Sequence, residues 1–226
     1  MSRIICGLPG PTGAWKRAGE YTKIPNVVEI NPIRPYDVIA SIKPCDLVFV
    51  DDRLAKQFAM SGDNVFVVNP LPSADVPPGS PIGEYRHQYQ CDFAIVNTPS
   101  EYAKSALREL SNNQAHFKVF GHYDYPIPEY VGIVDPSELP SVYSSAREVL
   151  DLVGNVFNVL AIGAAGGTCL SVANFSYPEI EFLNPTQNVY LAPFRYSHEF
   201  AQSITQKHTF AHRLQELVKN ANKRVN

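Results

Sequence analysis

The sequence predicts an α/β protein built from two Rossmann-like halves, of which the N-terminal one is reduced. Short apolar, β-branched runs alternate with segments of helical periodicity, which is typical of a doubly wound parallel sheet. A proline-rich stretch at 69–85 divides the chain between the two halves. The run Cys91–Val96 also shares three identities in six residues with Cys45–Val50, at a matching place in the other half. These identities are compatible with an internal repeat and with chance.

In the first half, four apolar runs predict strands, at residues 3–8, 26–30, 46–50 and 65–68. Residues 53–60 are expected to form a short helix after the third of these strands. The stretch 69–85 carries five prolines, which break regular structure and predict a linker. We therefore expect a short N-terminal, acceptor-side domain over 1–85, ending in this linker, and a second domain over 86–226.

The second half repeats the alternation of strands and helices. Strands are predicted at 91–96, 117–120, 130–134 and 168–172. Ser100 is expected to cap the N-terminus of one helix. Ser137 is expected to begin another, because the apolar residues from Leu139 to Leu150 fall on one helical face. Further helices are predicted at 156–164 and near the C-terminus, where one side is apolar: Phe210, Leu214, Leu217 and Val218.

The composition is that of an ordinary globular protein. The chain has 226 residues, of which 45% are hydrophobic and 18% charged. Its net charge of −3 gives no general attraction to nucleic acid. Basic residues nevertheless gather near the C-terminus, either as a binding face or as the solvated side of a helix and tail: Lys207, His208, His212, Arg213, Lys219, Lys223 and Arg224.

The cysteine and histidine spacing predicts neither disulfides nor a metal site. The four cysteines are scattered and form no C-x-x-C pair. His208 and His212 have the i, i+4 spacing of paired ligands, but no third ligand accompanies them. The chain opens without a signal peptide, and no apolar run approaches the ~20 residues of a membrane-spanning helix. We therefore expect a cytoplasmic protein without membrane insertion.

Two segments of the second half are candidates for ligand binding. The loop Asn97-Thr98-Pro99-Ser100 follows a strand and opens a helix, and a helix N-terminus favours a nearby anion by ~0.3–1 kcal/mol. This loop is placed to hold a diphosphate, with Lys104 as the fixed cation; a capped helix with an exposed lysine is the alternative. The segment 154–167 is apolar and rich in small residues, which permit close approach of a ligand or of a neighbouring element.

The order of motifs between Cys91 and Lys219 resembles a known family. The most specific element is Gly132-Ile133-Val134 followed by Glu138-Leu139-Pro140-x-x-Tyr143-x-x-Ala146, and His208-Thr209-Phe210-x-x-Arg213 closes the region. In this order the chain resembles the C-terminal domain of GT-B glycosyltransferases of the spore-maturation protein B-like group (glycosyl transferases group 1). The segment 177–183 stands where that family has the residues after its next strand.

The resemblance implies a GT-B glycosyltransferase that moves a sugar from a nucleotide-sugar donor, such as a UDP-sugar, to a hydroxyl acceptor on a glycan, a protein or modified DNA. It implies a metal-independent, retaining reaction with no cofactor besides the donor. Asp51, Asp52 and His122 are the candidate catalytic residues. The candidate donor-binding residues cover the diphosphate, the base, the ribose and the small-residue helix: Asn97, Thr98, Ser100, Lys104 and Arg108; Gly132 and Val134; Asn158; and Gly163.

Two departures from the family pattern leave other functions open. Asn97 stands in place of a glycine, and Asn158 in place of a glutamate that holds the donor ribose. An amide lacks the charged acceptor of a glutamate. A catalytically degenerate GT-B-like binding protein is therefore the first alternative. The second is a compact phage-type transferase acting on modified DNA bases, which the small size and the basic C-terminus suggest.

Overall fold

The computed structural model describes residues 2–122, 125–172, 192–194 and 198–225. The chain divides into two compact units. Unit 1 contains Met1–Pro78 together with Thr205–Asn226, and unit 2 contains Gly79–Ile204. Each unit holds its own largely parallel sheet with helices. The predicted α/β class with two Rossmann-like halves is confirmed.

Unit 1 is built on a four-stranded parallel sheet in the order β2-β1-β3-β4. Its core lies where the strands meet the helices, around Ile5, Val48 and Val50, which are fully buried. The elements are β1 Ile4–Gly7, α1 Ala14–Thr22, β2 Val27–Glu29, α2 Pro35–Ile39, β3 Leu47–Val50, α3 Asp52–Gln57 and β4 Val65–Val67. All four predicted strands of the first half are thus confirmed, whereas α1 was not predicted.

In unit 2, the described strands form a six-stranded sheet in the order β10-β9-β8-β5-β6-β7. Only β10 runs antiparallel to its neighbour. Read in chain order, this is the Rossmann order 3-2-1-4-5-6, with β5 and β8 at the centre. The strands are β5 Cys91–Val96, β6 Phe117–Phe120, β7 Tyr130–Gly132, β8 Ala146–Asp151, β9 Cys169–Ser171 and β10 Ala192–Phe194.

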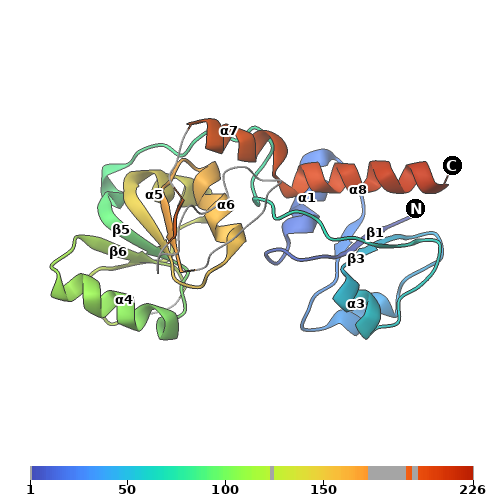
Figure 1. Ribbon diagram of the computed structural model, residues 1–226, viewed down its shortest axis with the longest axis horizontal. Helices are drawn as coiled ribbons and strands as arrows, with labels where there is room; N and C mark the ends of the chain where they lie inside the picture. The colour runs from blue at the N-terminus through green and yellow to red at the C-terminus, as the bar shows by residue number, and fades with distance from the viewer. Residues whose placement is uncertain (1, 123–124, 173–191, 195–197, 226) are drawn as a thin grey trace. The chain divides into compact units, whose positions relative to one another are not determined.

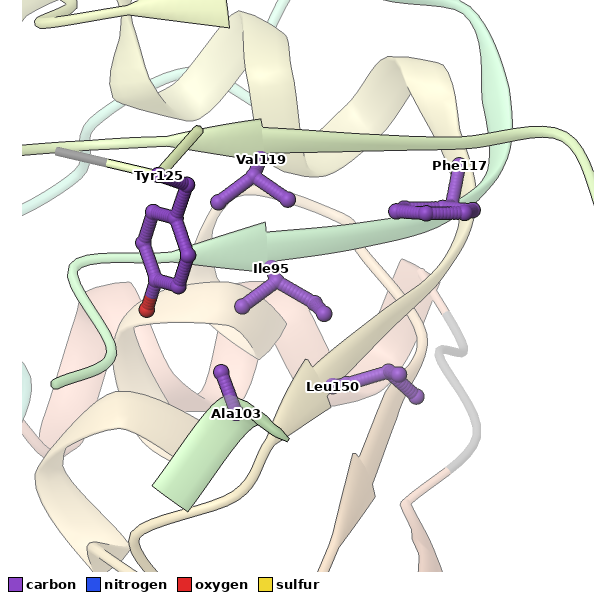
Figure 2. Packing of buried hydrophobic residues seen from close by; sticks show 6 residues of the cluster. All are labelled: Ile95, Ala103, Phe117, Val119, Tyr125 and Leu150. Atoms are coloured by element: carbon purple, nitrogen blue, oxygen red, sulfur yellow. The ribbon is translucent and has the colours of Figure 1, made fainter. Parts of the chain in front are cut away.

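The helices of unit 2 cover both faces of its sheet (Figure 1). One face carries α4, and the other carries α5 and α6. Figure 2 shows the core under α4, where Ala103 faces Ile95 and the side chains of Val119 and Leu150. The helical segments are η1 His87–Tyr89, α4 Ser100–Asn112, η2 Pro136–Glu138, α5 Leu139–Ser145, α6 Val156–Ala164 and α7 His198–Lys207, the last of which continues into unit 1.

The long helix predicted from Ser137 to Leu150 is wrong in its second half. The helix α5 ends at Ser145, and the next residues form β8, an inner strand of the sheet. Val149 pairs with Ala94 on one side and with Cys169 on the other. Since apolar residues in this segment satisfy both helical and strand spacing, pairing with two neighbouring strands decided the conformation.

The last helix, α8 Phe210–Val225, belongs to unit 1 rather than to the expected second domain of 86–226. It lies beside α1 (Figure 1), and the Phe210 ring packs edge-on against Trp15 with centroids 4.9 Å apart. An isolated bridge between Ala74 and Thr209 adds a second attachment. The apolar side of α8 is therefore buried against the N-terminal part of the chain. The break between the units, after Pro78, falls inside the proline-rich stretch.

None of the described helices is both long enough and apolar enough to cross a membrane.

Candidate functional site

A small pocket opens between the carboxyl ends of the central strands β5 and β8 in unit 2. In a Rossmann-ordered sheet this is the switch point, where the connections after adjacent strands leave to opposite faces and ligands bind. The cavity measures about 70 Å³. It is smaller than the roughly 300–1,000 Å³ of a site that encloses a whole ligand, so it suits one group of a larger molecule. Its lining residues are Val96, Asn97, Thr98, Tyr143, Val149, Leu150, Asp151, Asn158 and Ile162.

Asp151, the last residue of β8, is the only carboxylate among the described residues of this lining. Its side chain is buried, with 3% of the residue exposed. Three donors hold it: the Asn155 N–H at 2.8 Å and the Ser171 hydroxyl at 2.7 Å bind Oδ2, and the Asn158 amide binds Oδ1 at 3.2 Å. Because a carboxylate accepts about four hydrogen bonds, Oδ1 keeps capacity for one more donor.

Asp151 was not predicted as a site residue. An acidic residue directly after an apolar strand is a recognisable signal for a ligand-binding edge. The residues before Asp151, up to Leu150, were predicted to form a helix, so this signal was missed.

Asn158 lies in the first turn of α6 and lines the pocket; its contact with a donor ribose stays a prediction. The amide nitrogen of Asn158 donates to Asp151, and this hydrogen bond fixes the direction of the Asn158 side-chain carbonyl oxygen. Asn155 caps the same helix by accepting from the Phe157 N–H at 3.0 Å. The amide at 158 and the carboxylate at 151 therefore form one connected polar group at the mouth of the switch point.

Tyr143 contributes a phenol to the same pocket. Burial, followed by the nearby Cys169 and Asp151, raises the pKa of this phenol well above its usual value, so it stays protonated. Its hydroxyl has no hydrogen-bond partner among the residues that the structure describes. A phenol of this kind can donate to a ligand oxygen.

Asn97 adopts a left-handed backbone conformation, with φ at +48°. Its N–H donates to the Phe120 carbonyl at 2.9 Å, and its side chain lies against Gly121. Asparagine is among the few non-glycine residues that tolerate this region. The departure from the family glycine therefore preserves the backbone turn. Thr98, which follows, is buried, and its hydroxyl donates to the Val96 carbonyl at 3.3 Å.

The N-terminus of α4, immediately after this turn, carries no side-chain cap. The N-cap residue is Pro99, so the prediction that Ser100 caps the helix is wrong; Ser100 is instead its first residue. A proline at the N-cap offers no side-chain acceptor, which leaves the first N–H groups of α4 available to an anion.

The equivalent helix of unit 1 is α1, and its N-terminus is occupied by a side chain. The carboxylate of Glu29 accepts from the N–H groups of Gly13 at 3.0 Å and of Trp15 at 3.3 Å, so it occupies the N-terminus of α1. The protein's own anion fills that position. Of the two helices that follow the first strand of each sheet, only α4 keeps its N-terminus open within the described residues.

Lys104 and Arg108, the cations predicted to hold a diphosphate, are exposed on α4 one and two turns from its start. Neither lines the pocket. Their side chains are exposed to solvent. A role in binding a diphosphate therefore stays a prediction.

Gly132 and Val134, predicted to hold the base, lie at and after the end of β7. Gly132 has φ of +105° and open space where a side chain would stand. His122 is exposed, just after β6. The structure brings none of these three residues into the switch-point pocket. The segment 177–183 lies outside the described residues.

Gly163 is outside the pocket lining and permits helix packing, and its donor-binding role stays a prediction. A Cβ at this position would lie 2.6 Å from the Phe200 ring and 3.0 Å from Ile204, both on α7. The small residue therefore permits α6 and α7 to approach closely.

Asp51 and Asp52 belong to unit 1, at the carboxyl end of β3. Both line an open pocket of about 580 Å³ there. Asp51 is committed to capping α3, since its Oδ1 accepts from the Leu54 N–H at 2.6 Å. Asp52 is exposed and pairs with Lys56 at 2.6 Å. Such an exposed i, i+4 pair contributes about 0.3–0.5 kcal/mol, so Asp52 is held only weakly.

The Glu138 of the most specific family motif has a structural partner set. It accepts from Arg86 at 2.6 Å and from the Tyr89 hydroxyl. These two donors, Tyr89 first and then Arg86, lower the pKa of the Glu138 carboxyl. Glu138 thus fixes the segment before β5 to α5 from outside the pocket lining, whereas Tyr143 of the same motif lines the pocket.

Within the described residues, no three His, Cys, Asp or Glu side chains cluster as metal ligands. The fold and the site together define an α/β protein with two Rossmann-like sheets and a polar pocket at the switch point of unit 2. No protein-family model matches the chain, and no curated protein has a detectably similar sequence.

Proposed function

We propose that the protein is a glycosyltransferase of the GT-B type that transfers a sugar from a nucleotide-sugar donor to a hydroxyl acceptor. The observation that carries the proposal is the pocket at the switch point of unit 2, which gathers Asn97, Thr98 and Asn158 beside an uncapped helix N-terminus. Three residues singled out from sequence order alone thus share one small polar site.

Each polar group of the pocket has a role in this proposal. The free N–H groups of α4 stabilise the diphosphate, on which negative charge grows as the sugar leaves. Asn158 and Asp151 together accept from the ribose hydroxyls, so that Asp151 supplies the charge that the amide lacks. The occupied N-terminus of α1 favours unit 2 over unit 1 as the donor-binding half.

Calorimetric titration with UDP, other nucleoside diphosphates and their sugar conjugates tests the proposal. We expect a dissociation constant in the micromolar to millimolar range, followed by release of the nucleotide from a sugar conjugate in a hydrolysis assay. The variant Asn158→Leu removes the amide without adding charge and should weaken binding by up to about tenfold, the equivalent of one neutral hydrogen bond. Absence of nucleotide binding at millimolar concentration would contradict the proposal.

A non-catalytic nucleotide-binding protein is the second candidate, and a specific observation favours it. Asp151, the only carboxylate that the described part of the chain places in the pocket lining, is held by three protein donors. A carboxylate engaged in this way serves as a fixed hydrogen-bond acceptor for a ligand. Binding without turnover in the same assays would select this candidate. The catalytic roles of His122, Asp51 and Asp52 remain predictions of the enzyme hypothesis.

A further inference from the structure

A second concave site lies in unit 1, where the end of α7 meets α8 and the proline-rich stretch. It measures about 530 Å³, enough for a small ligand. Among the described residues, the cations Lys207, Arg213 and Lys219 line it, and Glu216 is the one carboxylate. The described lining residues are Leu71, Gln206, Lys207, His208, His212, Arg213, Gln215, Glu216 and Lys219. The site is locally positive although the chain carries a net charge of −3.

Arg213 is the buried charge of this site, with 8% of the residue exposed. Its Nη1 donates to Glu216 at 2.9 Å, and its Nη2 donates to His208 at 2.8 Å. Its Nε–H is buried without any acceptor. Glu216 is itself 60% exposed at the side chain, so water weakens its hold on the guanidinium. A buried guanidinium with one solvated counter-charge and an unpaired donor is incompletely neutralised.

His208 is held in one tautomer by this guanidinium. Arginine can only donate, so Nδ1 of His208 must accept, and its proton sits on Nε2. The Nε2–H then has no partner among the described residues. Burial, and next the charge of Arg213, lowers the pKa of His208 to about 4, so the ring is a neutral donor at pH 7.

His212, one turn further along α8, is fixed in a similar way. Its Nδ1 lies 2.8 Å from the Thr209 hydroxyl, which also accepts from the His212 N–H at 3.3 Å. The hydroxyl is thus oriented to donate to Nδ1, which leaves an Nε2–H donor on this ring as well. Both histidines line the same concavity as Lys207 and Lys219.

We propose that this site binds the phosphoryl group of a small phosphorylated ligand. Its donors are an arginine, two lysines and two imidazole N–H groups, which match the several acceptor oxygens and the charge of a phosphate better than a single carboxylate. The site is separate from the switch-point pocket and does not depend on the proposed transferase activity.

NMR titration of the full chain with inorganic phosphate and pyrophosphate, observing the histidine rings, tests this proposal. The His208 and His212 signals should shift with saturation, whereas those of His87, His116 and His122 should not. A bound dianion should also raise the midpoint of the His208 titration by about one pH unit, since an adjacent opposite charge favours the protonated ring. Acetate at equal concentration should cause smaller shifts.

Matched lysine variants supply the control. Lys207→Gln and Lys219→Gln should each weaken pyrophosphate binding by about threefold to tenfold. Lys223→Gln removes the same charge from an exposed position on α8 that does not line the site, and it should change binding by less than about twofold. All three positions are exposed, so the variants are expected to fold.

Three outcomes would overturn the proposal: no response of His208 to either anion, an effect of Lys223→Gln equal to that of Lys219→Gln, or a duplex DNA that binds with strong salt dependence while pyrophosphate does not. The last outcome would mark a nucleic-acid surface instead. If the protein binds UDP at the switch point but the His208 signal does not respond to phosphate, the phosphate-site proposal fails while the proposed function stands.

Discussion

At the scale of single residues, Asn97 shows how the backbone limits the choice of side chain. Its positive φ places it where glycine or asparagine is tolerated, and its N–H closes a turn onto Phe120. The sequence alone identified Asn97 as a departure from a family glycine. The physical reason for accepting asparagine became visible only with the dihedral angle.

Substitutions at Asn97 should therefore separate backbone strain from binding. Asn97→Gly is expected to change the free energy of unfolding by less than about 0.5 kcal/mol, because glycine adopts the same conformation freely. Asn97→Val should cost about 1–2 kcal/mol, since a β-branched residue is strained at positive φ. Denaturant unfolding measures both values. Equal stabilities of the two variants would contradict the strained turn.

Asp46 makes stability depend on pH. It is 1% exposed and accepts from Arg3 at 2.7 Å and from the Lys43 N–H at 2.8 Å. The Arg3 guanidinium is the main reason that the pKa of this carboxyl lies well below its ordinary value of 3.8. Since the folded pKa is depressed, the stabilisation is complete above the unfolded pKa and is lost as the pH falls below it.

Asp46→Asn should destabilise unit 1 by about 2–3 kcal/mol at pH 7, because it removes the charged acceptor of a largely buried pair. The difference from the wild type should begin to shrink below about pH 5 and be only partly lost at pH 3, because the folded pKa of Asp46 lies lower still. Urea unfolding at pH 7, 5 and 3 gives the comparison. A difference that stays constant over this range would show that the ion pair is not its source.

At the scale of elements, β8 shows that hydrophobic periodicity alone does not distinguish a short buried strand from a helix. Val149 and Leu150 fit a helical face as well as a buried strand, and only pairing with β5 and β9 distinguishes the two. Because of the same error Asp151 was not predicted as a site residue: an acidic residue after a helix, unlike one after a strand, does not indicate the ligand-binding edge of a sheet. The strands β5, β6, β7 and β9 were predicted, since prolines, glycines and polar turns bound them clearly, whereas β10 was not predicted.

The contact of α6 with α7 depends on the absence of a side chain at Gly163. Gly163→Ala should destabilise unit 2 by about 1–2 kcal/mol, although alanine favours helices, because its Cβ would overlap the Phe200 ring. In a Phe200→Leu background the same change should cost less, as the overlapping ring edge is gone. Thermal unfolding of the four chains measures the coupling. An identical cost in both backgrounds would mean that Phe200 is not the limiting contact.

At the scale of the whole molecule, the alternation of apolar runs with helical segments predicted the two α/β halves but not the place of the final helix. The apolar stripe of α8 was evident from Phe210, Leu214 and Leu217. Its partner was not, because α1 lies about 200 residues earlier and was not itself predicted. Long-range pairing of this kind leaves no local signal in the sequence.

The attachment of α8 to unit 1 predicts a selective effect of Phe210→Ala. Loss of this buried ring should cost unit 1 about 3–5 kcal/mol. The fluorescence of Trp15, the sole tryptophan, should change because the ring packs against it. Hydrogen exchange should accelerate in β1 and β3 while β5 and β8 keep their protection. Equal loss of protection in both sheets would contradict the division into units.

The central claim is that the switch-point pocket of unit 2 receives a nucleotide. A crystal structure of the protein with UDP tests it most directly. The expected density has its ribose within hydrogen-bond distance of Asn158 and Asp151 and its diphosphate against the first N–H groups of α4. Density at another place, or a pocket left empty at saturating UDP, would contradict the claim.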